Sequence, residues 1–169
     1  TEALNIYAGL YGKEHPDYAR CLSNLAVCNS ELGNYVEAIR LCNEAMNIRE
    51  RVLGKNHPEY AISLNNLAMA SLELGDYVEA MRFCTDALNI CENVYGKEHP
   101  NYAMTLKNLA VCNSELGKYA EAIRLGAEAL YIQERVFGKE HPDYASTLSN
   151  LAMNNSELGN YVEAIKLET

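Results

Sequence analysis

The stretch YGKEHPDYA at residues 11–19 decides how this chain folds, because the chain repeats it at a fixed spacing. Close variants follow in the order LGKNHPEYA, YGKEHPNYA and FGKEHPDYA at residues 53–61, 95–103 and 137–145, a step of 42 residues each time. Residues 11–52 and 95–136 are identical at 31 of 42 positions. A period of 20–50 residues is typical of solenoids and similar arrays, so each unit is expected to form one supersecondary element.

Each repeat unit has the pattern of two helices. In the first unit they run from about Pro16 to Leu32 and from about Tyr35 to Leu53. Apolar residues in both stretches recur at i, i+3, i+4 and i+7, which indicates one buried helix face. Neither stretch alternates apolar and polar residues as a strand would. The sequence therefore predicts an all-α fold.

The quoted stretch itself is predicted to be a joint between helices. Gly12 ends one helix and Pro16 begins the next, where its missing N–H needs no partner. His15 is expected at or beside the N-cap, and Asp17 lies at the positive end of the helix dipole. At the other turn of each unit, a glycine follows the first helix, and Asn34, Asp76 and Asn160 are expected to cap the second helix.

The recurring histidines suggest a metal or acid–base site as an alternative: His15, His57, His99 and His141. Equivalent atoms in stacked helical repeats lie about 10 Å apart, the helix-packing distance. Metal ligands must lie ~2 Å from one ion, so these histidines cannot share a metal. We find no other nucleophile–base spacing, phosphate loop or metal-ligand cluster. We therefore expect no catalytic residue, no metal, no cofactor and no enzymatic activity.

The net charge of the chain limits the classes of partner that it is expected to bind. Acidic residues outnumber basic ones by 23 to 14, giving a net charge of −9. Nucleic-acid binding rests on basic patches, and so does binding to anionic membranes, so neither partner is expected. Residues 54–95 have a net charge of −4 and residues 96–137 are neutral, which favours a neutral or basic protein partner.

The cysteines and the lack of a long apolar run favour a cytoplasmic location. The six cysteines include no C-x-x-C pair, so reduced, buried structural thiols are favoured over the alternative of a disulfide framework. No apolar run approaches the ~20 residues of a membrane span. The chain begins TEALNIYAGL without a Met, as expected of a piece of a longer protein.

A family resemblance lies in the second half of each unit. The segments Asn24-Leu25-Ala26, Leu32-Gly33, Tyr35, Glu37-Ala38 and Ala45-Met46 resemble the tetratricopeptide repeat. The 42-residue period and the run from Leu53 to Ala68 resemble kinesin light chain repeats. This resemblance implies a right-handed α-solenoid of helix–turn–helix repeats. One domain is expected over 1–169: residues 1–11 end a preceding repeat, units 12–53, 54–95 and 96–137 follow, and 138–169 is truncated.

The resemblance also implies a peptide-binding surface, since first helices line the inner face of such solenoids. The positions are Arg20, Ser23, Asn24, Val27, Ile62, Asn65, Asn66, Met69, Met104, Lys107, Asn108, Val111, Ser146, Ser149, Asn150 and Met153. One asparagine recurs at the same position in every unit, at Asn24, Asn66, Asn108 and Asn150. These amides can bond an extended peptide backbone, or they can tie neighbouring helices together. The sequence leaves both roles open.

Two functions remain open at this stage. The first is a scaffold that binds a linear peptide or partner segment along the first helices. The second is a structural spacer or self-assembling array that stacks end to end. Residues 1 and 169 share one repeat position, so head-to-tail association through residues 1–10 and 160–169 is a hypothesis of the second kind.

Overall fold

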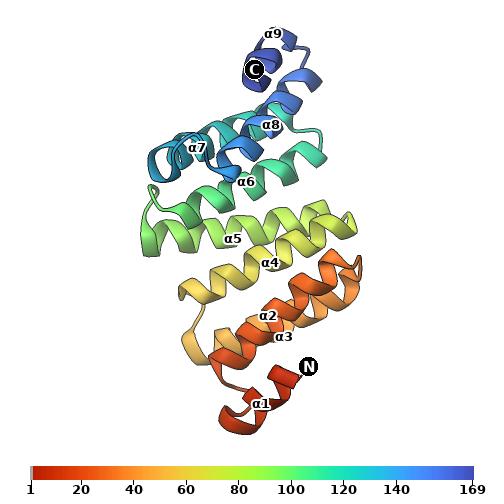
Figure 1. Ribbon diagram of the computed structural model, residues 1–169, viewed down its shortest axis with the longest axis vertical. Coiled ribbons are helices and arrows are strands. Elements are labelled where there is room, and N and C mark those ends of the chain that lie inside the picture. The colour runs from red at the N-terminus through yellow and green to blue at the C-terminus, as the bar shows by residue number, and fades with distance from the viewer. Residues whose placement is uncertain (1) are drawn as a thin grey trace. The chain divides into compact units, whose positions relative to one another are not determined.

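The computed structural model describes residues 2–169, which form helices and no strand (Figure 1). The helices in this part of the chain are α1 (Glu2–Tyr11), α2 (Pro16–Glu31), α3 (Tyr35–Leu53), α4 (Pro58–Leu74), α5 (Tyr77–Tyr95), α6 (Pro100–Glu115), α7 (Tyr119–Phe137), α8 (Pro142–Glu157) and α9 (Tyr161–Glu168). The all-α prediction is confirmed, and the first pair of predicted helices ends within one residue of the observed bounds.

The predicted joint forms as expected. Gly12 has a φ of 82°, a left-handed backbone that ends α1. His15 is the N-cap of α2, and its Nδ1 accepts a hydrogen bond from the backbone N–H of Asp17 at 3.2 Å. The equivalent bond recurs at His57, His99 and His141. An aromatic ring before the glycine stacks on the histidine in three joints, with the Tyr95 and His99 centroids 4.0 Å apart.

The prediction that Asn34 and Asn160 cap the second helices with their side chains is wrong. Both stand at the N-cap position, yet neither makes a side-chain cap hydrogen bond. Their backbone has ψ near 55° and is not extended, and the amide turns back instead. Asn34 Nδ2 donates to Asn29 Oδ1 at 3.4 Å. Asp76 does cap as predicted, since its Oδ1 accepts from the Glu79 N–H at 3.3 Å.

The chain divides into two compact units, with the boundary between Ile90 and Cys91 inside α5. In the first unit α2 packs on α3, α3 packs on α4, and α2 touches α4. In the second unit α6, α7, α8 and α9 pack in succession, and α6 touches α8. The assignment of all residues to one domain stays a prediction, and Thr1 lies outside the described residues.

Buried leucines and alanines form the core of each unit. Leu22, Leu41 and Leu64 are buried in the first unit, and Leu106, Leu125 and Ile132 in the second. Small residues such as Ala38 and Ala122 are fully buried where helices cross, which lets the helix axes approach. Four of the six cysteines are buried among them, as predicted: Cys42, Cys84, Cys91 and Cys112. The prediction of buried thiols is wrong for the other two, because Cys28 is exposed and Cys21 is half-buried.

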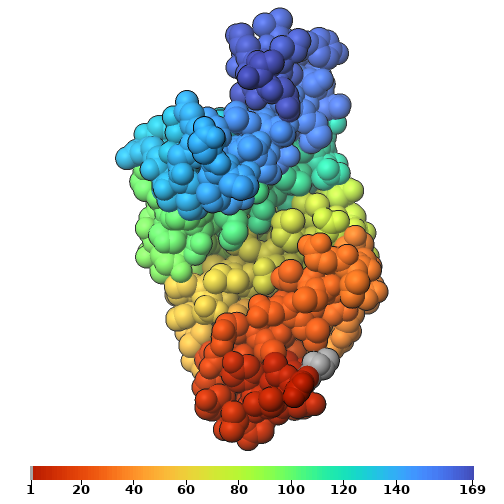
Figure 2. Space-filling view, viewed as in Figure 1, coloured from red at the N-terminus to blue at the C-terminus, as the bar shows by residue number. Residues whose placement is uncertain are grey.

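The last helix is the least covered part of the second unit. None of the residues of α9 is buried, and its dark-blue atoms are open to solvent in Figure 2. Over residues 2–169, no helix combines the length and hydropathy that a membrane span requires.

Candidate binding surface on the first helices

The predicted surface positions differ in exposure. Arg20, Asn24, Val27, Met69, Met104, Ser146, Ser149 and Met153 are exposed, and Ile62, Asn66, Lys107, Val111 and Asn150 are partly exposed. Three of the predicted residues are buried: Ser23, Asn65 and Asn108. Those three side chains offer little surface to a partner in this structure. A binding role for the predicted positions stays a prediction.

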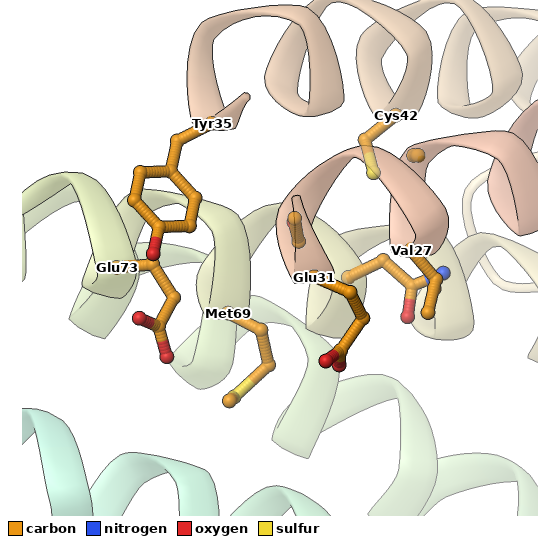
Figure 3. A pocket seen from close by; sticks show the side chains of 9 residues that line it. Val27, Glu31, Tyr35, Cys42, Met69 and Glu73 are labelled. Atoms are coloured by element: carbon orange, nitrogen blue, oxygen red, sulfur yellow. The ribbon is translucent and has the colours of Figure 1, made fainter. Parts of the chain in front are cut away.

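One cavity in the first unit brings several of these residues together. It has a volume of about 390 Å³ and opens among α2, α3 and α4. Its lining contains the predicted Val27, Asn66 and Met69, together with Ala26, Ser30, Glu31, Tyr35, Cys42 and Glu73. Figure 3 shows the side chains of Glu31, Met69 and Glu73 pointing to the same side. We call this site the α2–α4 pocket.

The α2–α4 pocket contains residues that the sequence analysis missed. Glu31 and Glu73 stand at the same position of successive repeats, in the motifs SELG and LELG, at the end of each first helix. The sequence could have identified these glutamates as site residues, because they recur at a fixed position close to the predicted ones. Tyr35 and Cys42 come from the second helix of the repeat, because this helix closes the pocket behind the first. A surface assigned to first helices alone omits them.

The pocket has an apolar floor and an acidic, exposed rim. Ala26 and Cys42 are buried at its base, while Val27 and Met69 are 48% and 40% exposed. Burial raises the pKa of the Cys42 thiol to about 11, so the thiol is protonated at neutral pH and acts as a wall rather than a nucleophile. No group of three or more potential metal ligands occurs among the described residues.

The recurring asparagines do not share one environment. Asn24 is exposed, Asn66 lines the α2–α4 pocket, and Asn108 is buried. Within residues 2–169, no side-chain hydrogen bond ties Asn24 or Asn66 to a neighbouring helix. These two amides therefore remain available to a partner, whereas the position of Asn108 suits a role inside the fold.

Two other predicted positions belong to polar clusters that join neighbouring helices. Ser23 Oγ accepts a hydrogen bond at 2.9 Å from Nη1 of Arg49, a buried arginine of α3. Lys107 Nζ forms an ion pair with Asp143 Oδ1 at 3.1 Å, from α6 to α8. Both residues hold their own unit together.

A second cavity lies in the other unit, between α8 and α9. It has a volume of about 450 Å³, and its lining includes the predicted Ser149 and Met153 with Tyr161, Ala164 and Ile165. Met153 occupies the same repeat position as Met69 after two periods. The same face of the repeat is thus open in both units, though different neighbours surround it.

The geometry first defines the class of protein: consecutive helices of 16–19 residues from α2 to α8, joined by repeated Gly and His-Pro turns, are typical of a helix–turn–helix repeat protein. The family model of the tetratricopeptide repeat matches residues 1–40, 22–83, 64–130 and 115–169. The chain belongs to the tetratricopeptide repeat family. The comparison with curated proteins gives no match.

Solved structures support the same fold. The chain is similar to BtubC (BKLC) from P. vanneervenii, with a TM-score of 0.84 and 24% identity over 98% of this chain and 66% of that one. It is also similar to kinesin light chain-like, nearly identical TPR-like repeats of Podosopora anserina, with a TM-score of 0.78 and 26% identity over 97% of this chain and 77% of that chain. Apo RapI matches with a TM-score of 0.77 and 19% identity over 88% of this chain and 52% of that one. The chain spans just under two thirds of BtubC.

Proposed function

We propose that this chain is a protein-interaction scaffold that binds a linear segment of a partner along its first helices, with the α2–α4 pocket as one anchoring point. The observation that carries the proposal is this pocket of about 390 Å³, which gathers Val27, Asn66 and Met69 from two repeats. Exposed apolar side chains beside unbonded amides suit a peptide, whose side chains need apolar contact and whose backbone needs hydrogen bonds.

A peptide-display selection tests the proposal. Random peptides are selected on the wild-type chain, and their affinities are then measured on a Val27→Ser, Met69→Ser variant. Both side chains are exposed, so the fold should survive, as circular dichroism would check. We expect affinity to fall about tenfold or more, since each substitution removes ~1 kcal/mol of apolar contact.

The matched control is a Val52→Ser, Val94→Ser variant. These valines are also exposed but lie outside the pocket lining. The control should bind the selected peptides as the wild type does. Peptides that bind the pocket variant equally well, or a selection that enriches no peptide, would contradict the proposal.

The partner's charge follows from the same surface. A neutral or basic protein partner fits the net charge of −9 and the acidic rim of the pocket. The free cysteines favour the cytoplasm as the place of this interaction. The same charge disfavours nucleic acid and anionic membranes as partners. No enzymatic step is needed for this role.

Self-assembly is the second candidate function. Helix α9 exposes Val162 and Ile165, and α1 exposes Ile6 and Leu10. Apolar residues on the first and last helices favour head-to-tail contact between copies through residues 1–10 and 160–169, of which Thr1 lies outside the described residues. Light scattering against concentration tests this role. A monomer at every concentration would contradict it, and loss of larger species in an Ile165→Ser variant would support it.

A further inference from the structure

We propose that the α2–α4 pocket selects a basic side chain, Arg or Lys, as the anchor residue of the bound segment. This inference rests on the proposed function and specifies the partner's chemistry at that site. Its basis is the combination of an apolar wall, Val27 and Met69, with two carboxylates, Glu31 and Glu73, in one cavity.

The two carboxylates have no cation of their own. Within residues 2–169, neither Glu31 nor Glu73 takes part in an ion pair. The basic residues of α2, α3 and α4 are already paired with other carboxylates: Arg20 with Asp17, Arg40 with Glu37 and Glu44, Arg49 with Glu59, and Arg51 with Glu14. The negative charge of the pocket is therefore left for a partner to balance.

The order of the lining residues matches a long basic side chain. Glu31 follows Val27 by four residues on α2, and Glu73 follows Met69 by four residues on α4. Four residues of helix rise by about 6 Å, so the carboxylates lie one turn beyond the apolar pair. An Arg or Lys side chain laid along the helices would place its methylene stem on Val27 and Met69 and its charged end at the glutamates.

Other anchor residues fit the pocket less well. An acidic side chain would face two like charges without a compensating cation. An apolar side chain would contact the wall but leave the carboxylates unpaired. A basic side chain can contact the apolar wall and also pair with the carboxylates. A guanidinium can in addition donate two parallel N–H hydrogen bonds to one carboxylate. The polar Asn66 and Ser30 in the lining add hydrogen-bonding groups beside the stem.

The test uses peptide pools that are random except for one fixed central residue: Arg, Lys, norleucine, citrulline or Glu. Norleucine keeps the stem without the charge, and citrulline keeps the shape of arginine without the charge. Fluorescence polarisation measures the affinity of each labelled pool for the full chain. We expect the Arg and Lys pools to bind about tenfold more tightly than the other three, as charge-assisted hydrogen bonds imply.

Two variants assign that preference to the pocket. Glu31→Gln, Glu73→Gln should abolish the advantage of the Arg and Lys pools. The control Glu98→Gln, Glu140→Gln makes the same change in net charge on exposed residues outside the pocket and should leave the advantage intact. A preference that survives in the pocket variant, or disappears equally in the control, would overturn the proposal.

The outcome also separates this proposal from the proposed function. If all pools bind equally and all lose affinity with Val27→Ser, Met69→Ser, the scaffold function stands and the basic anchor is wrong. If no pool binds the wild-type chain, both proposals are wrong.

Discussion

The two units contain equivalent polar clusters between their helices, but each unit builds its cluster from different residues. In the first unit, the buried Arg49 of α3 donates from Nη1 to Ser23 Oγ and Ser63 Oγ, and its Nη2 lies 3.0 Å from Glu59. The residues two periods later are Gln133, Lys107, Thr147 and Asp143. There the cation comes from the first helix instead, as the Lys107–Asp143 ion pair. One cation and one carboxylate are kept, although every residue of the cluster has changed.

The difference between the two clusters shows how the burial of a cation determines the partners that it needs. The Arg49 side chain is 2% exposed, whereas that of Lys107 is 19% exposed. Burial lowers the pKa of Arg49, and the nearby Glu59 opposes that change. Even so, Arg49 Nε has no hydrogen-bond partner among the described residues. A fully buried cation needs several acceptors, and a half-buried one needs a single carboxylate.

Removing each cation should give the largest contrast between the units. Arg49→Ala should lower the free energy of unfolding by about 3 kcal/mol, because it leaves a cavity and two buried hydroxyls without their donor. Lys107→Ala should cost about 1 kcal/mol or less, since both side chains of this ion pair are partly open to solvent, which screens the pair. Urea unfolding followed by circular dichroism measures both. Equal losses would show that burial does not distinguish the two clusters.

Moving the cation of the first unit to the position that it has in the second unit tests whether the two polar clusters are interchangeable. Ser23→Lys with Arg49→Gln gives the first unit the cation arrangement of the second. We expect the double variant to recover at least half of the stability that Arg49→Gln alone loses, about 1–2 kcal/mol of coupling between neighbouring sites. The same urea experiment on the two single variants and the double variant measures it. Additive effects would mean that the clusters are not interchangeable.

The N-caps of the second helices give a smaller difference. Asp76 caps α5 in the first unit, whereas Lys118 stands before α7 and makes no side-chain cap bond. Lys118→Asp should raise the stability by about 0.5 kcal/mol, because it reverses the charge at the helix N-terminus. A side-chain cap is not expected to add to this gain, because ψ at residue 118 is 55°, close to that of the uncapped Asn34. A thermal melt checks this, with Lys118→Asn as the control for charge. No gain from aspartate would reveal a compensating contact of the lysine.

The smallest effect on stability is expected from a glutamate–arginine pair that occurs in both units. Glu37 is bonded to Arg40, and Glu121 to Arg124. The hydrogen bond from the arginine lowers the pKa of each carboxyl from its ordinary value of 4.5. Their stabilisation is therefore complete above pH 4.5 and is lost as the pH falls below it.

Matched variants check that pH dependence. Glu37→Gln and Glu121→Gln should each remove a similar, small part of the acid sensitivity, measured as the melting temperature between pH 3 and pH 7. A clear difference between the two variants would mean that the shared pair is not equivalent in the two units.

The sequence predicts local structure here better than side-chain environment. Gly12, Pro16 and their repeats fix the helix ends because each acts through its own backbone, so the helix bounds follow directly. Asn34 fails as a cap because ψ at that residue is 56°, which sequence composition does not reveal. Ser23 and Asn24 are neighbours, yet one is buried and the other exposed, because adjacent residues point about 100° apart around a helix.

The candidate site likewise contains some residues that the sequence predicts and some that only the packing of the helices reveals. Val27, Asn66 and Met69 could be predicted from the inner-face positions of the repeat, whereas Tyr35 and Cys42 enter the pocket only through the packing of α3 behind α2 and α4. The roles of Arg49 and Lys107 depend on which helix meets which across a repeat junction. That is a tertiary property, and the sequence of a single repeat does not show which side chains will meet across the junction.

The Gly and His-Pro joint has a consequence for how such a chain changes in evolution. The hydrogen bonds that end one helix and begin the next link residues that are near neighbours in sequence, from the Gly12 N–H bonded to Ala8 to the His15 side chain bonded to Asp17. A duplicated stretch of 42 codons therefore carries a complete joint and both of its helices with it. Unequal crossing-over between such copies adds or deletes whole repeats in frame, so lineages can change the length of the array in single genetic steps.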